Sequence, residues 1–355
     1  MDLLDRVKRD VERNALRARN GVKLVAGIDR PKLGQSPKDV VWARDRAELW
    51  HYRADGPRRS PPLLIVFSLV TRSYVLDLRP GNSFVEHLLS AGFDVFMLDW
   101  GIPDERDAGN TLEDYADEYL PQAVDRVLEV ADAEELNLLG YCFGGVLSLL
   151  YAAHHPDAPL RSLTTMATPV DFSDFGVFGE LVQEGRVDLD TILDEDGNVP
   201  GSAVGESFRL LRPTGDLQSY ATLLEKAWND EYVTAYQAMN RWANDHIPFP
   251  GAAARQSIEM LLRGNGFVED TVRLGGEAVS LGDICVPYMN VMAKRDHIVP
   301  SQTAAPAVSL VGSEDKDELQ LDAGHIGLVV GRTAAKVTIP TIIEFLAART
   351  EEAVA

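Results

Sequence analysis

The sequence predicts an α/β fold with a mostly parallel central sheet and a mainly helical cap inserted late in the chain. Three observations carry this prediction. The short, continuous apolar run at 63–67 is typical of a strand buried on both faces, and the stretches at 94–98 and 160–166 predict further strands. Helical stretches separate these runs, which favours parallel strands joined by right-handed crossovers. A fourth run, at 136–139, leads into a glycine-rich turn that opens a helix.

The composition is typical of a soluble globular protein with a sizeable core. The 355 residues are 45% hydrophobic and 25% charged. A formal charge of −21 argues against nucleic acid as a partner. No apolar run reaches the roughly 18 residues of a membrane span, and residues 1–6 lack the pattern of a signal peptide. The only two cysteines, Cys142 and Cys285, argue against a disulfide framework. We therefore expect a cytoplasmic protein with no transmembrane segment.

The first third of the chain alternates helices and strands. Residues 1–27 predict an amphipathic helix, which we expect to pack on its own domain, with partner docking as the alternative. Alternating runs at 40–42 and 48–52 favour an antiparallel hairpin at a sheet edge. A helix over 84–91 follows, and Thr111 opens a second helix with the capping pattern Thr-Leu-Glu-Asp.

The pattern changes between residues 173 and 283. Helical stretches such as 220–228 and 255–263 occur there, and no buried-strand run interrupts them. We interpret this segment as a mainly helical cap over the catalytic edge of the sheet.

The strand–helix alternation resumes after the cap, with strands at 286–292 and 318–321 and a final helix over about 336–349. The predicted domain organisation has three parts: an N-terminal helix and linker over 1–35, an α/β core over 36–172 and 284–355, and a cap over 173–283.

The glycine-rich turn has the spacing of a nucleophile elbow, with cysteine where serine is commoner: Gly140-Tyr-Cys142-Phe-Gly144-Gly145. The residue at the tip of such a strand-to-helix turn takes a strained backbone, so its neighbours two before and two after must be small. The turn also puts the thiol at the positive end of a helix, which favours thiolate. A small buried cysteine on a glycine-rich turn is the alternative. We predict that Cys142 is a nucleophile.

An attacking thiol needs a base, and the base needs an orienting carboxylate. In an α/β hydrolase the acid and then the histidine follow the nucleophile along the chain, each on a loop after a strand. Asp296 follows the predicted strand at 286–292, and His325 follows the next one. His297 is adjacent to the acid, so His325 is the preferred base. Each of these residues taken alone also fits an ordinary loop position, but their order predicts a Cys142–His325–Asp296 triad.

The oxyanion hole of such a site uses backbone N–H groups. The residue after the nucleophile, Phe143, should supply one, and Val70, in the loop 68–72 after an early strand, is our choice for the second. We expect no metal in the site. Cys285 is predicted to be a small core residue at the start of a strand.

Several motifs together resemble the catalytic subunits of polyhydroxyalkanoate synthases, closest to the short forms that work with a second subunit. The similarity runs from about residue 36 to the final helix. The matching motifs are Gly140-Tyr-Cys-Phe-Gly-Gly145, Pro62-Leu-Leu-Ile-Val66, Tyr74-Val-Leu-Asp-Leu78, Asp99-Trp-Gly101, Thr168-Pro-Val-Asp-Phe172, Asp296-His297 and Gly324-His325-Ile-Gly327. Thr71 departs from the pattern, since many relatives have Asn there. The resemblance implies an α/β-hydrolase fold with Cys142 as the acylated nucleophile, His325 as the base and Asp296 as the third member.

By this resemblance the chain polymerises 3-hydroxyacyl-CoA into a polyester and releases coenzyme A through a covalent acyl-thioester. A thiol accepts an acyl group from a thioester nearly isoenergetically, so the enzyme can reload repeatedly. The coenzyme A thioester is then a substrate, and no cofactor is expected. The resemblance also implies a second synthase subunit, a homodimer or hetero-oligomer, and a place in the cytoplasm at the polymer granule surface. A water-excluding, mobile lid would give the cap its purpose.

Two other functions fit part of the sequence. A Cys-triad hydrolase is the first, because dienelactone hydrolases have a very similar Gly-Tyr-Cys-x-Gly-Gly elbow, and a thioesterase belongs to the same class. Dienelactone hydrolases are shorter and lack both the long cap and the Asp-Trp-Gly motif. A non-catalytic granule-surface subunit is the second, but such a scaffold has no need of a triad.

Overall fold

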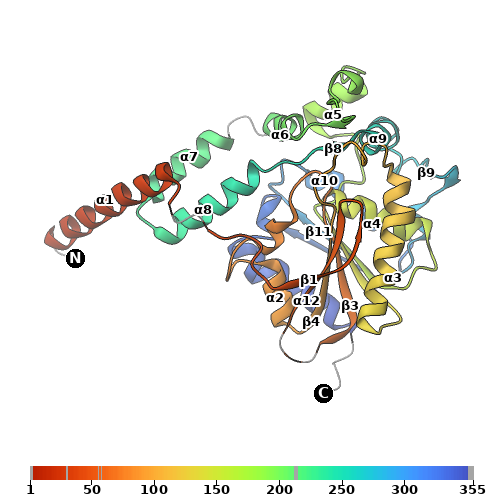
Figure 1. Ribbon diagram of the computed structural model, residues 1–355, viewed down its shortest axis with the longest axis horizontal. Coiled ribbons are helices and arrows are strands. Elements are labelled where there is room, and N and C mark those ends of the chain that lie inside the picture. Colours follow the sequence, from red (N-terminus) through yellow and green to blue (C-terminus); the bar gives the residue numbers. More distant parts are fainter. Residues whose placement is uncertain (1–2, 29–30, 55, 57, 212–214, 351–355) are drawn as a thin grey trace.

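A computed structural model describes residues 3–28, 31–54, 56, 58–211 and 215–350. Its centre is an eight-stranded sheet in the order β1-β2-β4-β3-β5-β6-β11-β12 (Figure 1). The strands from β4 to β12 in this order are parallel, while β2 pairs antiparallel with both β4 and β1. The predicted hairpin at the edge of a mostly parallel sheet is confirmed. The strands are β1 Lys38–Arg44, β2 Ala47–Tyr52, β3 Arg59–Val66, β4 Phe93–Asp99, β5 Leu136–Tyr141, β6 Leu160–Met166, β11 Tyr288–Ala293 and β12 Lys316–Leu321.

The apolar runs form strands because both faces of the sheet are covered. Successive side chains of a strand point to opposite faces. In β3, Leu63 and Ile65 enter one hydrophobic cluster, whereas Leu64 and Val66 enter the other. All four side chains are fully buried. Neither face could tolerate a polar residue at these positions, which is why the sequence shows no alternation there.

Helices cover the two faces of the sheet (Figure 1). On one face lie α3 (Leu120–Ala131) and α4 (Phe143–His154), and on the other lie α2 (Phe84–Ser90) and α12 (Ile339–Ala347). A π-helical turn, η2 (Asp114–Tyr119), leads into α3. Shorter helical turns complete the core: η1 Ser73–Asp77, α10 Ser301–Ala304, α11 Ala307–Leu310, η6 Ile326–Leu328 and η7 Ala334–Thr338.

The capping pattern at Thr111 is present. The Thr111 hydroxyl accepts the backbone N–H of Asp114 at 3.1 Å and donates to the Asp114 carboxylate at 2.8 Å. The same carboxylate accepts the backbone N–H of Thr111 at 2.7 Å. This reciprocal capping starts the helical segment that continues through η2 into α3.

Over its described residues, the segment 173–283 is mainly helical, with four strands of two residues each. Its elements are α5 Gly176–Gln183, η3 Leu189–Thr191, β7 Asn198–Val199, α6 Gly201–Leu210, α7 Gly215–Lys226, α8 Asp230–Ala243, β8 Phe249–Pro250, α9 Gly251–Gln256, η4 Ser257–Arg263, β9 Arg273–Leu274, β10 Glu277–Ala278 and η5 Leu281–Asp283. Its later part contributes Ala253, Leu261 and Phe267 to the hydrophobic cluster that also contains α3 and α4. The stretch from α9 onward therefore packs beside the core, and the domain boundaries stay a prediction.

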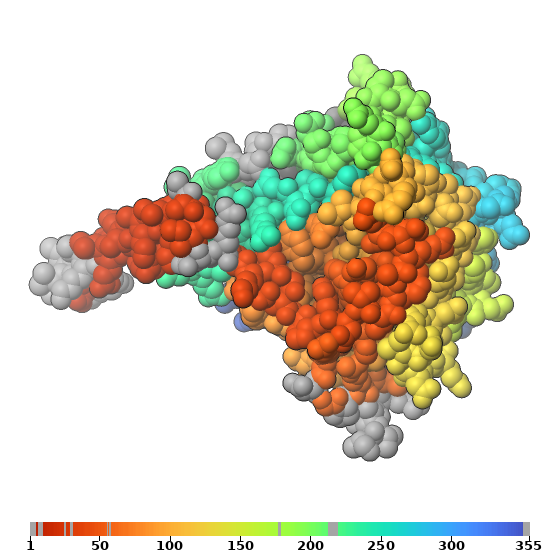
Figure 2. Space-filling model, in the orientation of Figure 1, coloured from red at the N-terminus to blue at the C-terminus, as the bar shows by residue number. Residues whose placement is uncertain are grey.

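The predicted N-terminal helix is α1 (Leu3–Ala26), which projects from the body of the molecule (Figures 1 and 2). It packs at the turn between α7 and α8 and not on the sheet. The Asn20 amide donates to the carbonyl of Ala227 at 2.8 Å, and the Arg13 guanidinium lies 4.4 Å from the centre of the Trp228 ring. Over the part of the chain that the structure describes, no helix is both long and apolar enough to cross a membrane.

Candidate active site

The turn between β5 and α4 holds Cys142 in a strained conformation. Its φ of 56° and ψ of −123° lie in a region that side chains rarely adopt. The surrounding glycines leave no room for larger residues. A Cβ on Gly140 would collide with the backbone of Gly145, and one on Gly145 would collide with the side chain of Thr168. A Cβ on Gly144 would strike the backbone carbonyls at the end of β3. The sequence forms an elbow here because glycine alone permits this close approach of helix and sheet.

Cys142 is partly exposed at the N-terminus of a buried helix. Its backbone N–H donates to the carbonyl of Met166 at 2.8 Å, which ties the elbow to the end of β6. The thiol thus lies at the positive end of the helix dipole of α4, where negative charge is stabilised.

The structure brings His325 and Asp296 together at the same edge of the sheet. Asp296 follows β11 and His325 follows β12, and parallel neighbours end at one edge. The Nδ1–H of His325 donates to Oδ2 of Asp296 at 2.7 Å. The other carboxylate oxygen accepts the backbone N–H groups of Ile298 and Val299 at 2.8 and 2.9 Å. The Asp296 side chain is fully buried, so its orientation is fixed by three hydrogen bonds.

The charges around His325 hold a proton on its ring. Burial alone would lower the pKa of His325, but the negative charges of Asp296 and of the Cys142 thiolate raise it, and hydrogen bonds to both groups add to the effect. Together they raise the pKa of His325 to about 10. The raised pKa therefore favours the imidazolium form of His325 beside Asp296.

Cys142 and His325 line one cavity of about 450 Å³, together with Val70 and Thr71 from the loop after β3. Another part of its wall comes from α6, α8 and the segment after α8. It includes Phe208, Arg209, Met239, Trp242 and His246. These wall residues could not be predicted from the sequence, because the cap segment contains no recognisable site motif.

The two predicted oxyanion donors lie at this site. Phe143 is the first residue of α4, so no carbonyl within that helix can accept its backbone N–H. The backbone N–H of Val70 donates to the Ser68 hydroxyl at 3.4 Å, a long hydrogen bond that an oxyanion could replace. The catalytic roles of these donors, and of the three triad residues, stay predictions.

Comparisons with known proteins decide the family. Residues 61–331 match the α/β hydrolase fold model, and residues 4–88 match a model described as the N-terminus of poly-beta-hydroxybutyrate polymerase. A poly(3-hydroxyalkanoate) polymerase subunit of Allochromatium vinosum is 37% identical over 92% of this chain and 92% of its own length. One from Synechocystis is 31% identical over 93% of this chain and 90% of its own. The chain belongs to the poly(3-hydroxyalkanoate) polymerase family. The resemblance and the enzyme class that the sequence predicts, an acyltransferase, are thereby confirmed.

Solved structures of lower identity share the fold. Epoxide hydrolase A of Mycobacterium thermoresistibile aligns with a TM-score of 0.52 at 13% identity, covering 90% of this chain and 100% of its own. A hydrolase from Pseudomonas aeruginosa aligns with a TM-score of 0.51 at 17% identity, covering 89% and 99%. These likenesses confirm the α/β-hydrolase fold and carry no information about substrate.

In this polymerase, the Asp99-Trp-Gly101 motif holds the loop 68–72, which lies beside the cavity. The Nε1–H of Trp100 donates to the carbonyl of Phe67 at 2.7 Å, just after the end of β3. The Asp99 carboxylate accepts the backbone N–H of Gly101 at 2.9 Å and a hydrogen bond from the Ser73 hydroxyl. Both ends of the loop that carries Val70 are therefore fastened to this motif.

Cys285 is exposed, so the expectation of a core residue at the start of a strand is wrong. It lies in the irregular segment before β11, which begins only at Tyr288. The preceding Ile284 is buried and takes the inward position, which leaves the Cys285 side chain pointing outward.

Proposed function

We propose that this chain polymerises 3-hydroxyacyl-CoA into poly(3-hydroxyalkanoate), with release of coenzyme A and with Cys142 as the acylated nucleophile. The observation that carries the proposal is one cavity that holds a thiol on a strained elbow and a histidine bonded to a buried carboxylate. The names of the relatives, poly(3-hydroxyalkanoate) polymerase subunits, support the choice of product.

Acylation uses the thiolate–imidazolium pair. The Cys142 sulfur attacks the carbonyl carbon of the substrate thioester, and the negative charge moves to the carbonyl oxygen, where the N–H groups of Phe143 and Val70 would hold it. The tetrahedral intermediate collapses and breaks the bond to the coenzyme A sulfur. His325 protonates that leaving thiolate, and an acyl-thioester on Cys142 remains.

Chain extension uses the same residues. The 3-hydroxyl group of a second acyl unit gives its proton to His325 and attacks the acyl-thioester on Cys142. An ester bond forms, the bond to sulfur breaks, and Cys142 leaves as the thiolate beside the protonated His325. Asp296 keeps the ring oriented and stabilises its positive charge in both steps. The starting state returns, so the cycle can repeat.

Water must not reach the acyl-thioester, because hydrolysis would end the polymer. Phe208, Met239 and Trp242 contribute apolar side chains to the wall of this cavity, beside the polar Arg209 and His246. These apolar side chains would limit the access of water, which favours transfer of the acyl group to a substrate hydroxyl. We assign α6 and α8, which carry them, the role of a lid.

The test is incubation of the protein with 3-hydroxybutyryl-CoA, with released thiol and polyester measured in parallel. A polymerase releases one coenzyme A for each unit added to the polymer. A hydrolase of the dienelactone or thioesterase type would release the same thiol together with free 3-hydroxybutyrate and no polymer. If neither thiol nor polymer is formed, the result would point to a non-catalytic subunit.

The proposal extends to a second synthase subunit and to attachment at the polymer granule. Its support is apolar surface on the projecting helices: Val11 and Val22 of α1 are each 64% exposed, and Leu224 of α7 is 74% exposed. Such side chains are favoured at protein or polymer interfaces. We expect the lone chain to polymerise slowly or after a lag, and Val22→Glu with Leu224→Glu should abolish stimulation by a partner while leaving the basal rate unchanged.

A further inference from the structure

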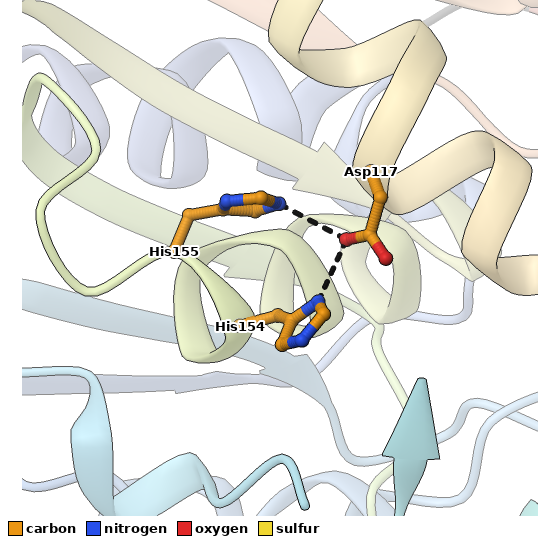
Figure 3. A group of neighbouring side chains, drawn as sticks. All are labelled: Asp117, His154 and His155. Carbon is orange, nitrogen blue, oxygen red and sulfur yellow. Dashed lines mark hydrogen bonds and ion pairs between the residues drawn. The ribbon is translucent and has the colours of Figure 1, made fainter. Parts of the chain in front are cut away.

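Two adjacent histidines end the elbow helix far from the thiol. His154 and His155 lie at the C-terminus of α4 and converge on Asp117 of η2 (Figure 3). The Nδ1 of His154 lies 2.8 Å and the Nε2 of His155 lies 3.0 Å from the same carboxylate oxygen of Asp117. Cys142 is separated from them by the 12 residues of α4, or about 18 Å of helix. The cluster is therefore not part of the candidate active site.

We propose that Asp117, His154 and His155 bind one divalent transition-metal ion of the zinc class. Their three ligand atoms all lie within 4.8 Å of one another. Zinc bonds to nitrogen and oxygen of about 2.0 to 2.2 Å give tetrahedral ligands a spacing of about 3.3 Å. The hydrogen-bonded pairs, at 2.8 and 3.0 Å, need to open by only a few tenths of an ångström. Two imidazoles and a carboxylate suit zinc and its neighbours better than calcium or magnesium.

The surroundings of His154 match those of a metal ligand. Its second nitrogen, Nε2, lies 3.6 Å from a carboxylate oxygen of Glu277 on β10. Metal-bound histidines usually donate their other N–H to a carboxylate, which fixes the tautomer. When Nδ1 binds the ion, the proton of the neutral ring moves to Nε2, where Glu277 can accept its hydrogen bond.

The backbone also favours a cation at this place. The C-terminus of α4 carries the negative end of the helix dipole. Asp117 lies in η2, and π-helical turns often mark functional sites. The side chains of His154, Asp117 and His155 are 16%, 24% and 36% exposed, so an ion can enter and keep one position for water. The ion would link η2 to the end of α4, which gives it a structural role and not a catalytic one.

A second histidine–carboxylate pair supplies the matched control. The Nε2 of His51 lies 2.8 Å from Oδ1 of Asp94, the same spacing as at His154. There the guanidinium of Arg58 donates to the same oxygen. A positive charge already occupies the position that an ion would take, so His51 should bind none.

The experiment is equilibrium dialysis of the chelator-stripped full-length protein against zinc chloride, with bound zinc measured by atomic spectroscopy. We expect one ion per chain in the wild type and in His51→Gln, and its loss in the double variant His154→Gln with His155→Gln. Zinc should also raise the melting temperature of the wild type and not that of the double variant. Glutamine can keep hydrogen bonds to Asp117, so the variant should fold, and circular dichroism checks this.

Cobalt substitution identifies the ligands independently. Cobalt bound by imidazole and carboxylate should show visible absorption without the charge-transfer band of a thiolate. A thiolate band would place the ion at Cys142 or Cys285 and overturn the proposal. Equal zinc binding by the wild type and the double variant would overturn it as well, and so would full binding by Asp117→Asn. Coenzyme A release by the stripped enzyme should be retained, since the site lies far from Cys142.

Discussion

The replacement Asp296→Asn tests the proposed triad most sharply, because the structure fixes how the new amide would lie. One oxygen of Asp296 accepts the backbone N–H groups of Ile298 and Val299, at 2.8 and 2.9 Å. An asparagine must keep its carbonyl oxygen there, since an NH₂ group would face two donors. The amide NH₂ then points at Nδ1 of His325. That nitrogen becomes an acceptor, and the proton of the ring moves to Nε2, on the side of Cys142.

A histidine in this tautomer cannot take a proton from a thiol or from a substrate hydroxyl. The variant also loses the negative charge that raises the pKa of His325. The comparable change in a serine protease triad lowers kcat by about 10⁴-fold. We expect a loss of the same order here, equivalent to about 5.4 kcal/mol of transition-state stabilisation. Release of coenzyme A from 3-hydroxybutyryl-CoA, followed with a thiol reagent, measures it.

Asp296→Ala separates chemistry from stability. It removes the same hydrogen bond to His325 but also leaves the N–H groups of Ile298 and Val299 without an acceptor. Each unpaired buried group costs about 1 to 3 kcal/mol, so alanine should destabilise the protein by roughly 2 to 6 kcal/mol. In urea unfolding, Asp296→Asn should lower the free energy of unfolding far less than Asp296→Ala does. Both variants should lose the same amount of activity. An asparagine variant that keeps a tenth or more of the wild-type rate would refute the role given to Asp296.

Three further predictions concern the thiol, the base and the lid. Cys142→Ala should abolish labelling by radioactive acyl-CoA and polymer formation while the fold persists; label mapped to Cys285 would refute the assignment. His325→Gln should lose several orders of magnitude in turnover. Because the native pKa of His325, about 10, lies above the unfolded value of 6.5, its imidazolium stabilises the fold fully below pH 6.5 and loses this effect as pH rises through 10. The free energy of unfolding of the wild type in urea should therefore exceed that of His325→Gln by an amount that shrinks between these two pH values. A difference that stays constant with pH would contradict the raised pKa of His325. Amides of α6 and α8 should exchange hydrogen faster than those of β3 and slow down with substrate; protection equal to that of β3 would exclude a mobile lid.

The sequence was most informative where local sterics and chain order determine the structure. A strand such as β3 could be predicted because a strand buried on both faces needs an uninterrupted apolar run. The elbow could be predicted because only glycine fits at positions 140, 144 and 145. The approach of Asp296 to His325 followed from two parallel strands that end at one edge of the sheet.

The rest depends on packing between distant segments, which leaves no local pattern. The helical stretches of the cap segment look alike in the sequence, yet α8 forms a wall of the cavity while η4 contributes Leu261 and Leu262 to the hydrophobic cluster that contains α4. Trp242 shows the cause: its Nε1–H donates to the carbonyl of Arg72 at 2.7 Å, a contact across 170 residues. The exposure of Cys285 was missed for a similar reason, because the strand begins at Tyr288, two residues later than the predicted strand at 286–292.

The helix α4 connects the two proposals through a single physical property. Its residues from Gly144 to Ala153 are all buried, so little water screens the dipole of its peptide groups. The positive end holds Cys142, where a thiolate is stabilised, and the negative end holds His154 and Asp117, where a cation is stabilised. Charges of opposite sign at the two ends each lower the energy of the same helix. An ion at the C-terminal end would also restrain α4 against η2, which stabilises the fold without changing the elbow.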